Sequence, residues 1–440
     1  MRHPLKPSVA AEIGGDAPRS VWRLRVVAVC LGLTALAFLQ DPGLIVIDTK
    51  VDLAVDPAGW LGRALHVWDP AGTFGQLQNQ AYGYLWPMGS FFLAGKLLAI
   101  PAWVVQRLWW AVVMTVAFTG VVKLAERLGI GTPWARIIAG VAFALSPRLL
   151  TELGPISVEA WPSALAPWVL VPLVGLAHGA PLRRAVTRSA LVVACAGGVN
   201  ATAVLAVVPL AVIWLAGLHP ARLRLRALGA WCLAVACATA WWVVPLLLLG
   251  RFSPPFLDYI ETADVTTAPT DMVSVLRGAS HWHAYLGGSF GPPWTAGWRL
   301  ATEEPLIVAT LVVAGLGVAG LARRGMPHRW FLVTGLMTGL ALVGLGHVGA
   351  VPGLFGEAQR AFLDSAGAPL RNVHKFDVVL RLPLILGLAH LIGLMGRSAA
   401  TATGEARRPA RQRAAVVTGV ALAAVAAVAS PALAGGLAAQ

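Results

Sequence analysis

Residues 222–249 read RLRLRALGAWCLAVACATAWWVVPLLLL, a basic start followed by 23 residues without a charged side chain. An apolar run of about 20 residues is long enough to cross the hydrocarbon core of a membrane as a helix. Because the core holds no water to satisfy backbone groups, a helix is the expected conformation. Basic residues collect on the cytoplasmic side of such helices. The stretch therefore predicts a transmembrane helix with its start in the cytoplasm.

The whole chain has the composition of a membrane protein. It is 57% hydrophobic and 12% charged over 440 residues, whereas soluble domains carry about 25% charged residues. Similar apolar blocks predict about eleven spans: 22–40, 101–122, 134–150, 160–177, 184–198, 200–217, 227–249, 304–322, 329–347, 378–396 and 414–434. The apolar stretch 88–100 has only 13 residues and contains Lys96, so we expect an interfacial or re-entrant helix there.

The distribution of charge predicts the orientation. With the N-terminus in the cytoplasm and the C-terminus outside, the cytoplasmic segments hold 22 of the 34 Lys and Arg residues but only four of the 20 acids. This agrees with the excess of basic residues on cytoplasmic loops. Counting 88–100 as a full span would move every later loop to the opposite side of the membrane. The separation of basic residues from acids would then be lost. We therefore expect a multi-pass protein of the plasma (inner) membrane.

The net charge of +14 invites a nucleic-acid interpretation, which its distribution excludes. The basic residues are scattered in short clusters between spans. There they set the orientation of the spans in the membrane and contact anionic lipid headgroups. We therefore predict membrane lipid as a partner and no nucleic acid. The positive cytoplasmic face could also dock an acidic protein.

Three long loops are predicted outside the membrane: 41–100, 251–303 and 348–377. The spans themselves are almost empty of ionisable groups. A transporter or flippase of lipid-linked sugars would carry polar groups at mid-membrane, which makes it the weaker alternative. A non-catalytic membrane scaffold is the second alternative. The concentration of polar residues in the loops favours an enzyme that works at the outer surface.

The first long loop offers candidate catalytic carboxylates. Asp48, Asp52 and Asp56 follow each other at intervals of four residues, which would place them on one face of a helix. The pair Asp56-Pro57 is more typical of a turn or a helix cap. A carboxylate just outside a span could accept the proton of an acceptor hydroxyl while that hydroxyl attacks a sugar. Solvated loop acids with capping roles are the alternative.

Amides and aromatic rings follow in the same loop. Amide groups hydrogen-bond sugar hydroxyls and rings stack on sugar faces, which makes this segment a candidate sugar site. An interfacial aromatic belt explains the rings equally well. The candidate residues are Gln78, Asn79, Gln80, Tyr82 and Tyr84.

The third long loop ends in a cationic cluster directly before a span. Arg371, His374 and Lys375 lie at the outer surface, where the positive-inside rule disfavours basic residues. Such groups could bind a donor phosphate and ease its departure. Binding of lipid headgroups is the alternative.

Other polar residues give weaker signals. The pair His281 and His283 could bind metal, but two histidines without a third ligand are weak support. Glu152 and Glu159 could line the same cavity as the loops or cap helices. We predict no certain cofactor and assign no metal ligands, although Asp48 with Asp52 could hold a divalent ion.

Five short segments resemble the AftD-type α-(1→3)-arabinofuranosyltransferases of actinobacterial cell-wall synthesis. The resemblance runs from about residue 22 to 397. The segments are DTKVDL at 48–53, QNQAYGY at 78–84, QRLWW at 106–110, ALSPR at 144–148 and RNVHKFD at 371–377.

The resemblance implies an all-α GT-C glycosyltransferase fold at 22–397, between a cytoplasmic basic N-terminus at 1–21 and a linker with the last helix at 398–440. It also implies decaprenylphosphoryl-arabinose as donor and the arabinan of arabinogalactan or lipoarabinomannan as acceptor. The acidic residue that the family places in the first outside loop falls on Asp48. Members are usually longer, with an outside C-terminal part bearing carbohydrate-binding modules, which we expect to be missing here. We therefore predict an arabinofuranosyltransferase with Asp48 as general base, Asp52 as the second choice and an active site on the extracytoplasmic face.

Overall fold

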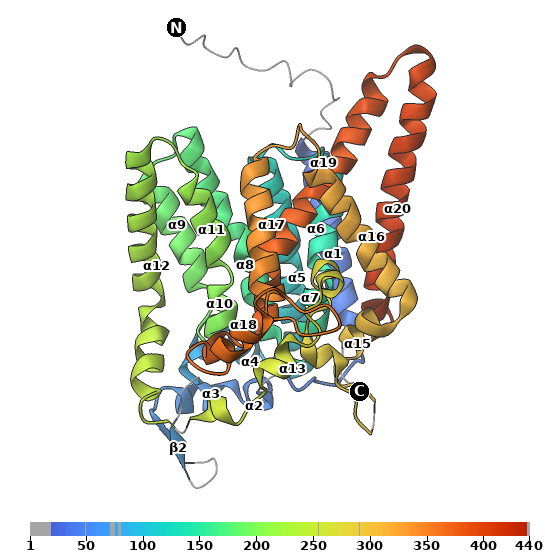
Figure 1. Ribbon diagram of the computed structural model, residues 1–440. Helices are drawn as coiled ribbons and strands as arrows, with labels where there is room; N and C mark the ends of the chain where they lie inside the picture. The colour runs from blue at the N-terminus through green and yellow to red at the C-terminus, as the bar shows by residue number, and fades with distance from the viewer. Residues whose placement is uncertain are drawn as a thin grey trace.

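The structure is a computed structural model that describes residues 19–48, 50–70, 75–77, 81–253, 255–289 and 291–437. Over these residues the protein is a bundle of helices that run roughly alongside one another (Figure 1). The only sheet in the described part has two strands, which pair antiparallel with Trp68 opposite Leu77. The predicted all-α architecture is confirmed.

Among the described residues, seven helices are long and apolar enough to cross a membrane. The protein is therefore a multi-pass membrane protein. The principal helices of the bundle are α1 (Arg19–Phe38), α5 (Ala102–Arg127), α6 (Pro133–Ala144), α8 (Ser157–Val174), α9 (Leu182–Ala194), α11 (Val208–Ala216), α12 (Ala221–Leu249), α16 (Glu304–Leu321), α17 (Arg329–Gly344), α19 (Asp377–Thr401) and α20 (Arg407–Leu433).

Two of the predicted spans are interrupted helices. The span expected at 134–150 consists of α6 and a separate short helix, α7 (Pro147–Glu152). Proline lacks an amide proton and disfavours a helical conformation in the preceding residue, so Pro147 begins a new helix. The span expected at 200–217 divides into α10 (Ala201–Leu205) and α11. The stretch 88–100 contains α4 (Met88–Leu97), whose ten residues are too few to span, as predicted.

Short elements gather at one end of the bundle, the lower end in Figure 1, where the three long loops meet. Helix α1 begins near the opposite end, and α20 ends at the loop end. These elements are α2 (Val51–Val55), α3 (Pro57–Ala64), α13 (Ala263–Thr267), α14 (Met272–Arg277), α15 (Thr295–Thr302), α18 (Gly356–Leu363), β1 (Trp68–Asp69), β2 (Gln76–Leu77), η2 (Ala81–Leu85), η4 (Phe256–Asp258), η5 (Trp282–Tyr285), η6 (Ala368–Leu370) and η7 (Val373–Phe376). Two further short elements, η3 (Gly175–His178) and η8 (Gly404–Ala406), connect α8 to α9 and α19 to α20.

Helix α19 occupies the centre of the bundle, packed against α6, α16, α17 and α20. Its residues from Asp377 to Gly393 are all buried. Glycines allow its closest approach to α16, since a Cβ added at Gly320 would lie 1.9 Å from the carbonyl oxygen of Gly387. Small residues at helix contacts let membrane helices pack through van der Waals contact. The segment just before α19, which holds the predicted cationic cluster, is thereby anchored to the core.

Candidate active site

The segment that carries Asp48 is held in place by the start of α5. The side-chain amide of Gln106 accepts a hydrogen bond of 2.9 Å from the backbone N–H of Val46 and donates one of 2.8 Å to the carbonyl of Val46. The guanidinium of Arg107 donates to the carbonyl of Leu44 at 3.1 Å and stacks on the ring of Trp110. An extended segment has no internal hydrogen bonds, so these side chains supply the partners that its backbone needs.

Asp48 is buried, with 4% of its surface exposed, and its carboxylate meets the start of α8. One carboxylate oxygen accepts a hydrogen bond of 2.8 Å from the backbone N–H of Ser157, and the other accepts from the Ser157 hydroxyl. The Ser157 hydroxyl in turn accepts a hydrogen bond of 2.9 Å from the indole of Trp109. A helix N-terminus stabilises a negative charge through its unpaired N–H groups and its dipole. The fold thus keeps a carboxylate oriented in a buried position.

Asp48 also lines a pocket of ≈ 190 Å³ between the first loop and α4, together with Lys50, Met88 and Gln106 among others. A second pocket of ≈ 690 Å³ shares Ala54 and Phe92 with the first, so the two adjoin each other. The lining of the second pocket is apolar except for Lys96. A mostly apolar pocket therefore adjoins the smaller pocket that Asp48 lines.

The other two acids of the predicted row are separated from Asp48. Asp52 lies on α2 with its side chain 62% exposed and makes a surface ion pair of 3.5 Å with Arg63. Asp56 caps α3 by accepting a hydrogen bond from the backbone N–H of Gly59, as its Asp-Pro sequence predicts. The three do not share a helix face, because Asp48 precedes α2 and Asp56 follows it.

The predicted cationic cluster meets an acid of α8. The Lys375 ammonium lies 3.0 Å from one Glu159 oxygen, which also accepts a hydrogen bond of 2.8 Å from the Asn200 amide. A His374 ring nitrogen lies 3.9 Å from the other oxygen, and the Arg148 guanidinium lies 3.8 Å from it. Glu159 follows Ser157 by two residues, so the first turn of α8 connects the first and third long loops.

A second buried acid extends this cluster. Glu152 makes a 3.2 Å ion pair with Arg148, and one of its oxygens lies 2.7 Å from a ring nitrogen of His283. Burial raises the pKa of Glu152, but His283 and Arg148 outweigh it and hold the pKa below its usual value. Burial and the Arg148 charge lower the pKa of the neighbouring His281 well below its usual value. The cluster therefore combines two carboxylates and two cations with the buried rings of His281, His283 and His374.

Arg371 is buried within the third loop and bonded to backbone. Its guanidinium donates to the carbonyls of Leu363, Leu257 and Glu261 at 3.2, 2.9 and 2.7 Å. It also pairs with Asp364 at 3.2 Å. This arrangement ties the second and third long loops together, and the phosphate-binding role of Arg371 stays a prediction.

The predicted sugar-binding residues are only partly described. Gln78, Asn79 and Gln80 lie outside the described residues. Tyr84 is buried with its ring 5.8 Å from that of Trp60. Burial raises the pKa of Tyr82 to about 12, so its phenol stays protonated and able to donate to a hydroxyl.

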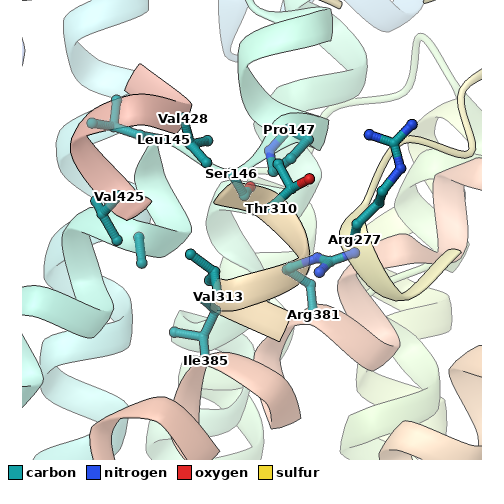
Figure 2. Close-up of a pocket in the computed structure, with 11 residues that line it drawn as sticks. Leu145, Ser146, Pro147, Arg277, Thr310, Val313, Arg381, Ile385, Val425 and Val428 are labelled. Atoms are coloured by element: carbon teal, nitrogen blue, oxygen red, sulfur yellow. The ribbon is translucent and has the colours of Figure 1, made fainter. Parts of the chain in front are cut away.

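Figure 2 shows a further pocket of ≈ 320 Å³ on the core side of this region. Its lining is polar at Ser146 and Thr310 and apolar at Val425 and Val428. Arg381 also borders it, with its guanidinium bonded to Asp377 and to the carbonyls of Val275 and Leu276. Thr310 donates within its own helix, whereas the buried Ser146 hydroxyl makes no hydrogen bond to the described residues.

The sequence pointed only weakly to Arg148, Glu152, Glu159 and His283. Glu152 and Glu159 flank an outside turn, which indicated a shared cavity without naming their partners. His283 belongs to a two-histidine motif that lacked a third ligand in its own segment. The structure supplies those partners from other loops, which spacing along the chain cannot reveal.

Comparison with known proteins supports the family resemblance. A family model described as "Alpha-(1->3)-arabinofuranosyltransferase, N-terminal GT-C domain" matches residues 32–440. An alpha-(1->3)-arabinofuranosyltransferase of Mycobacterium tuberculosis (strain ATCC 25618 / H37Rv) is 46% identical over 396 residues, covering 89% of this chain and 27% of that protein. One of Mycolicibacterium smegmatis (strain ATCC 700084 / mc(2)155) is 47% identical over 359 residues, covering 81% of this chain and 25% of that protein.

A solved structure agrees with these matches. The cryo-EM structure of arabinofuranosyltransferase AftD from Mycobacteria superposes with a TM-score of 0.74 at 41% identity, covering 94% of this chain and 27% of that one. The chain thus spans about a quarter of the length of these relatives. Since the family model matches most of its length, the chain belongs to the alpha-(1->3)-arabinofuranosyltransferase family and corresponds to the N-terminal GT-C domain.

Proposed function

We propose that this chain is the catalytic membrane part of an arabinofuranosyltransferase, which moves arabinofuranose from a polyprenyl-phosphate donor to a cell-wall arabinan. The single observation that carries the proposal is the buried Asp48 carboxylate, which the Ser157 amide holds in a pocket next to a larger apolar one. The family match supports arabinofuranose as the sugar that is transferred. Arabinogalactan and lipoarabinomannan are the proposed acceptors.

The reaction follows from these groups. The Asp48 carboxylate accepts the proton of an acceptor hydroxyl while that oxygen attacks C1 of the donor arabinose. The bond between C1 and the phosphate oxygen breaks, and its electron pair leaves with the polyprenyl phosphate. The apolar pocket of ≈ 690 Å³ that adjoins the Asp48 pocket suits the polyprenyl chain, since apolar surface is favourably removed from water.

Lys375 and His374 are the proposed contacts of the donor phosphate. Both are buried and both lie next to Glu159, two residues after the serine that holds Asp48. A cation near the departing phosphate stabilises the charge that develops there. Arg371, whose guanidinium is bonded to three carbonyls, is proposed to fix the loop that presents them.

The proposed location of the reaction is the extracytoplasmic face of the inner membrane. The short elements of the three long loops lie at the end of the bundle opposite the start of α1 (Figure 1), and Asp48 belongs to the first of these loops. At the other end, the basic residues of 222–226 and 407–413 lie in the first turns of α12 and α20, and 323–324 follow the end of α16. The positive-inside rule then supports an orientation with about eleven spans and the loops outside.

The test is a transfer assay with the purified chain in lipid nanodiscs. A radiolabelled polyprenyl-phosphoryl-arabinofuranose serves as donor and a short synthetic arabinan as acceptor. Replacing a general base typically lowers the rate by about 10²–10⁴-fold, so we expect that loss for Asp48→Asn. Asp52→Asn, at an exposed position, should retain the wild-type rate. Wild-type rates in Asp48→Asn, or no transfer by the wild type, would contradict the proposal.

The same assay distinguishes the two alternatives. A flippase would move the labelled lipid between leaflets of a proteoliposome without forming labelled arabinan. A scaffold would form no labelled arabinan, and neither Asp48→Asn nor Lys375→Met would change the result of the assay. Transfer that depends on Asp48 excludes both.

A further inference from the structure

Three buried residues from three separate segments bring their ligand atoms together. Glu152 ends α7, His283 lies in η5 and His374 lies in η7. One carboxylate oxygen and one ring nitrogen from each histidine all lie within 4.8 Å of one another. The three side chains are 0%, 4% and 1% exposed. Such convergence needs three loops to be folded against each other and does not arise from one motif.

Part of this group has no hydrogen bond among the described residues. Oε2 of Glu152 and both ring nitrogens of His374 are buried and make no hydrogen bond to any residue in the described part of the chain. The other Glu152 oxygen accepts a hydrogen bond of 3.2 Å from Arg148 and lies 2.7 Å from Nε2 of His283. Buried polar atoms nearly always have a hydrogen-bond partner or a bound ion. The convergence of these atoms therefore indicates a binding site for an ion.

We propose that Glu152, His283 and His374 form a site for a divalent transition-metal ion of the Zn²⁺ type. Neutral imidazole nitrogen and carboxylate oxygen are the ligands that Zn²⁺ takes, and two histidines with one glutamate leave a coordination position open. Calcium and magnesium prefer ligand sets made only of oxygen, which two histidines do not provide. The site is independent of Asp48 and Asp52, whose carboxylates bond to Ser157 and Arg63.

The surrounding charges determine what the open position accepts. Arg148 pairs with Glu152 and lies near Glu159, which Lys375 also contacts. These two cations already balance the two carboxylates, so a bound dication leaves the cluster positive. Positive charge in a buried region favours an anion as the remaining ligand. The His281 ring, centred 5.1 Å from that of His374, adds a neutral neighbour.

The ion would connect the turn between α6 and α8 to the second and third long loops. Part of this connection exists without it, since the Trp282 indole donates a 2.8 Å hydrogen bond to the side chain of Asn372. Metal binding is a property distinct from sugar transfer, and its measurement does not depend on a donor or an acceptor. The site can therefore be tested whether or not the proposed function holds.

The experiment uses the purified chain in nanodiscs, stripped with a chelator and titrated with Co²⁺ alone. We expect one ion per chain, visible absorption bands of low-symmetry Co²⁺ and displacement by Zn²⁺. X-ray absorption of the wild-type complex should show scattering from two imidazole rings. His283→Ala and His374→Ala should each weaken Co²⁺ binding at least 100-fold. Glu152→Gln should also weaken Co²⁺ binding, although glutamine keeps the size and shape of the glutamate side chain. His66→Ala, at an exposed loop position, is the matched control and should bind as the wild type.

Two outcomes would overturn the proposal. The first is a wild-type protein that takes up no stoichiometric Co²⁺, which needs no variant to interpret. The second is Co²⁺ binding that stays unchanged in Glu152→Gln, His283→Ala and His374→Ala. Metal-free melting temperatures of the variants establish that each is folded before its affinity is compared.

Discussion

The carboxylate of Asp48 accepts a 2.8 Å hydrogen bond from the backbone N–H of Ser157, a residue 109 positions further along the chain. Ser157 begins α8, and Glu159 in the same helical turn contacts Lys375 at 3.0 Å. One helix start therefore holds the proposed general base and the proposed phosphate-binding loop. The predictions below test the parts of this arrangement separately.

Ser157→Ala should reduce transfer without abolishing it. The substitution removes the hydroxyl that donates to Asp48 but keeps the backbone N–H that also donates. A hydrogen bond to a charged group contributes about 1.5–3 kcal/mol, which sets the expected loss of unfolding free energy. Thermal unfolding and the transfer rate are the two measurements. Ser163→Ala, at a buried serine of the same helix, is the control, and equal effects of both substitutions would contradict a specific role for Ser157.

Gln106→Leu should release the segment that carries Asp48. Leucine fills a similar volume but loses both hydrogen bonds to the backbone of Val46. Each such bond contributes about 0.5–1.5 kcal/mol net, so the loop should open locally while the bundle stays folded. Hydrogen exchange should quicken at the Val46 amide and stay unchanged at Val113, inside α5. Unchanged exchange at Val46 would show that other contacts hold this segment.

The pair of Lys375 and Glu159 should behave as a buried ion pair. Lys375→Met leaves Glu159 with less compensation, and breaking such pairs costs about 3–5 kcal/mol of stability. In a double-mutant cycle, adding Glu159→Gln to Lys375→Met should recover part of the lost stability. Lys123→Met is the surface control, because the exposed pair with Glu126 contributes at most about 1 kcal/mol. If Lys375 also binds the donor phosphate, Lys375→Met should raise the KM for the donor, which Lys123→Met should not.

Two glycines of α16 should respond to alanine in opposite directions. A Cβ at Gly320 would lie 1.9 Å from the carbonyl oxygen of Gly387, whereas one at Gly315 has no heavy atom within 4 Å. Gly320→Ala should therefore force α16 away from α19 and lower the melting temperature. Gly315→Ala should raise it slightly, since alanine favours a helix over glycine by about 1 kcal/mol. A neutral Gly320→Ala would mean that the two helices pack less tightly than described.

Much of the fold could be predicted from composition and charge. Long apolar runs such as 227–249 and 378–396 coincide with α12 and α19, because span length is fixed by membrane thickness. The breaks inside spans were harder to predict. Pro147 divides the stretch 134–150, and the stretch 200–217 divides between α10 and α11, just before Pro209, although hydropathy alone joins each into a single span.

The candidate site was predictable in its parts but not in its assembly. Asp48, His374 and Lys375 were distinguished by their position at a membrane surface and by the family resemblance. Their partners Ser157 and Glu159 come from a different loop, and no local pattern specifies such pairing. The predicted row of Asp48, Asp52 and Asp56 failed as a helix face, because Asp48 lies in an extended segment before α2.

The most direct test of the account compares Asp48→Asn with the wild type in transfer of labelled arabinofuranose from the polyprenyl-phosphate donor. Asparagine keeps the size of the side chain, so a rate loss reports on the missing base. The account predicts a fall of about 10²–10⁴-fold with little change in the donor KM. Transfer by Asp48→Asn at the wild-type rate would contradict it.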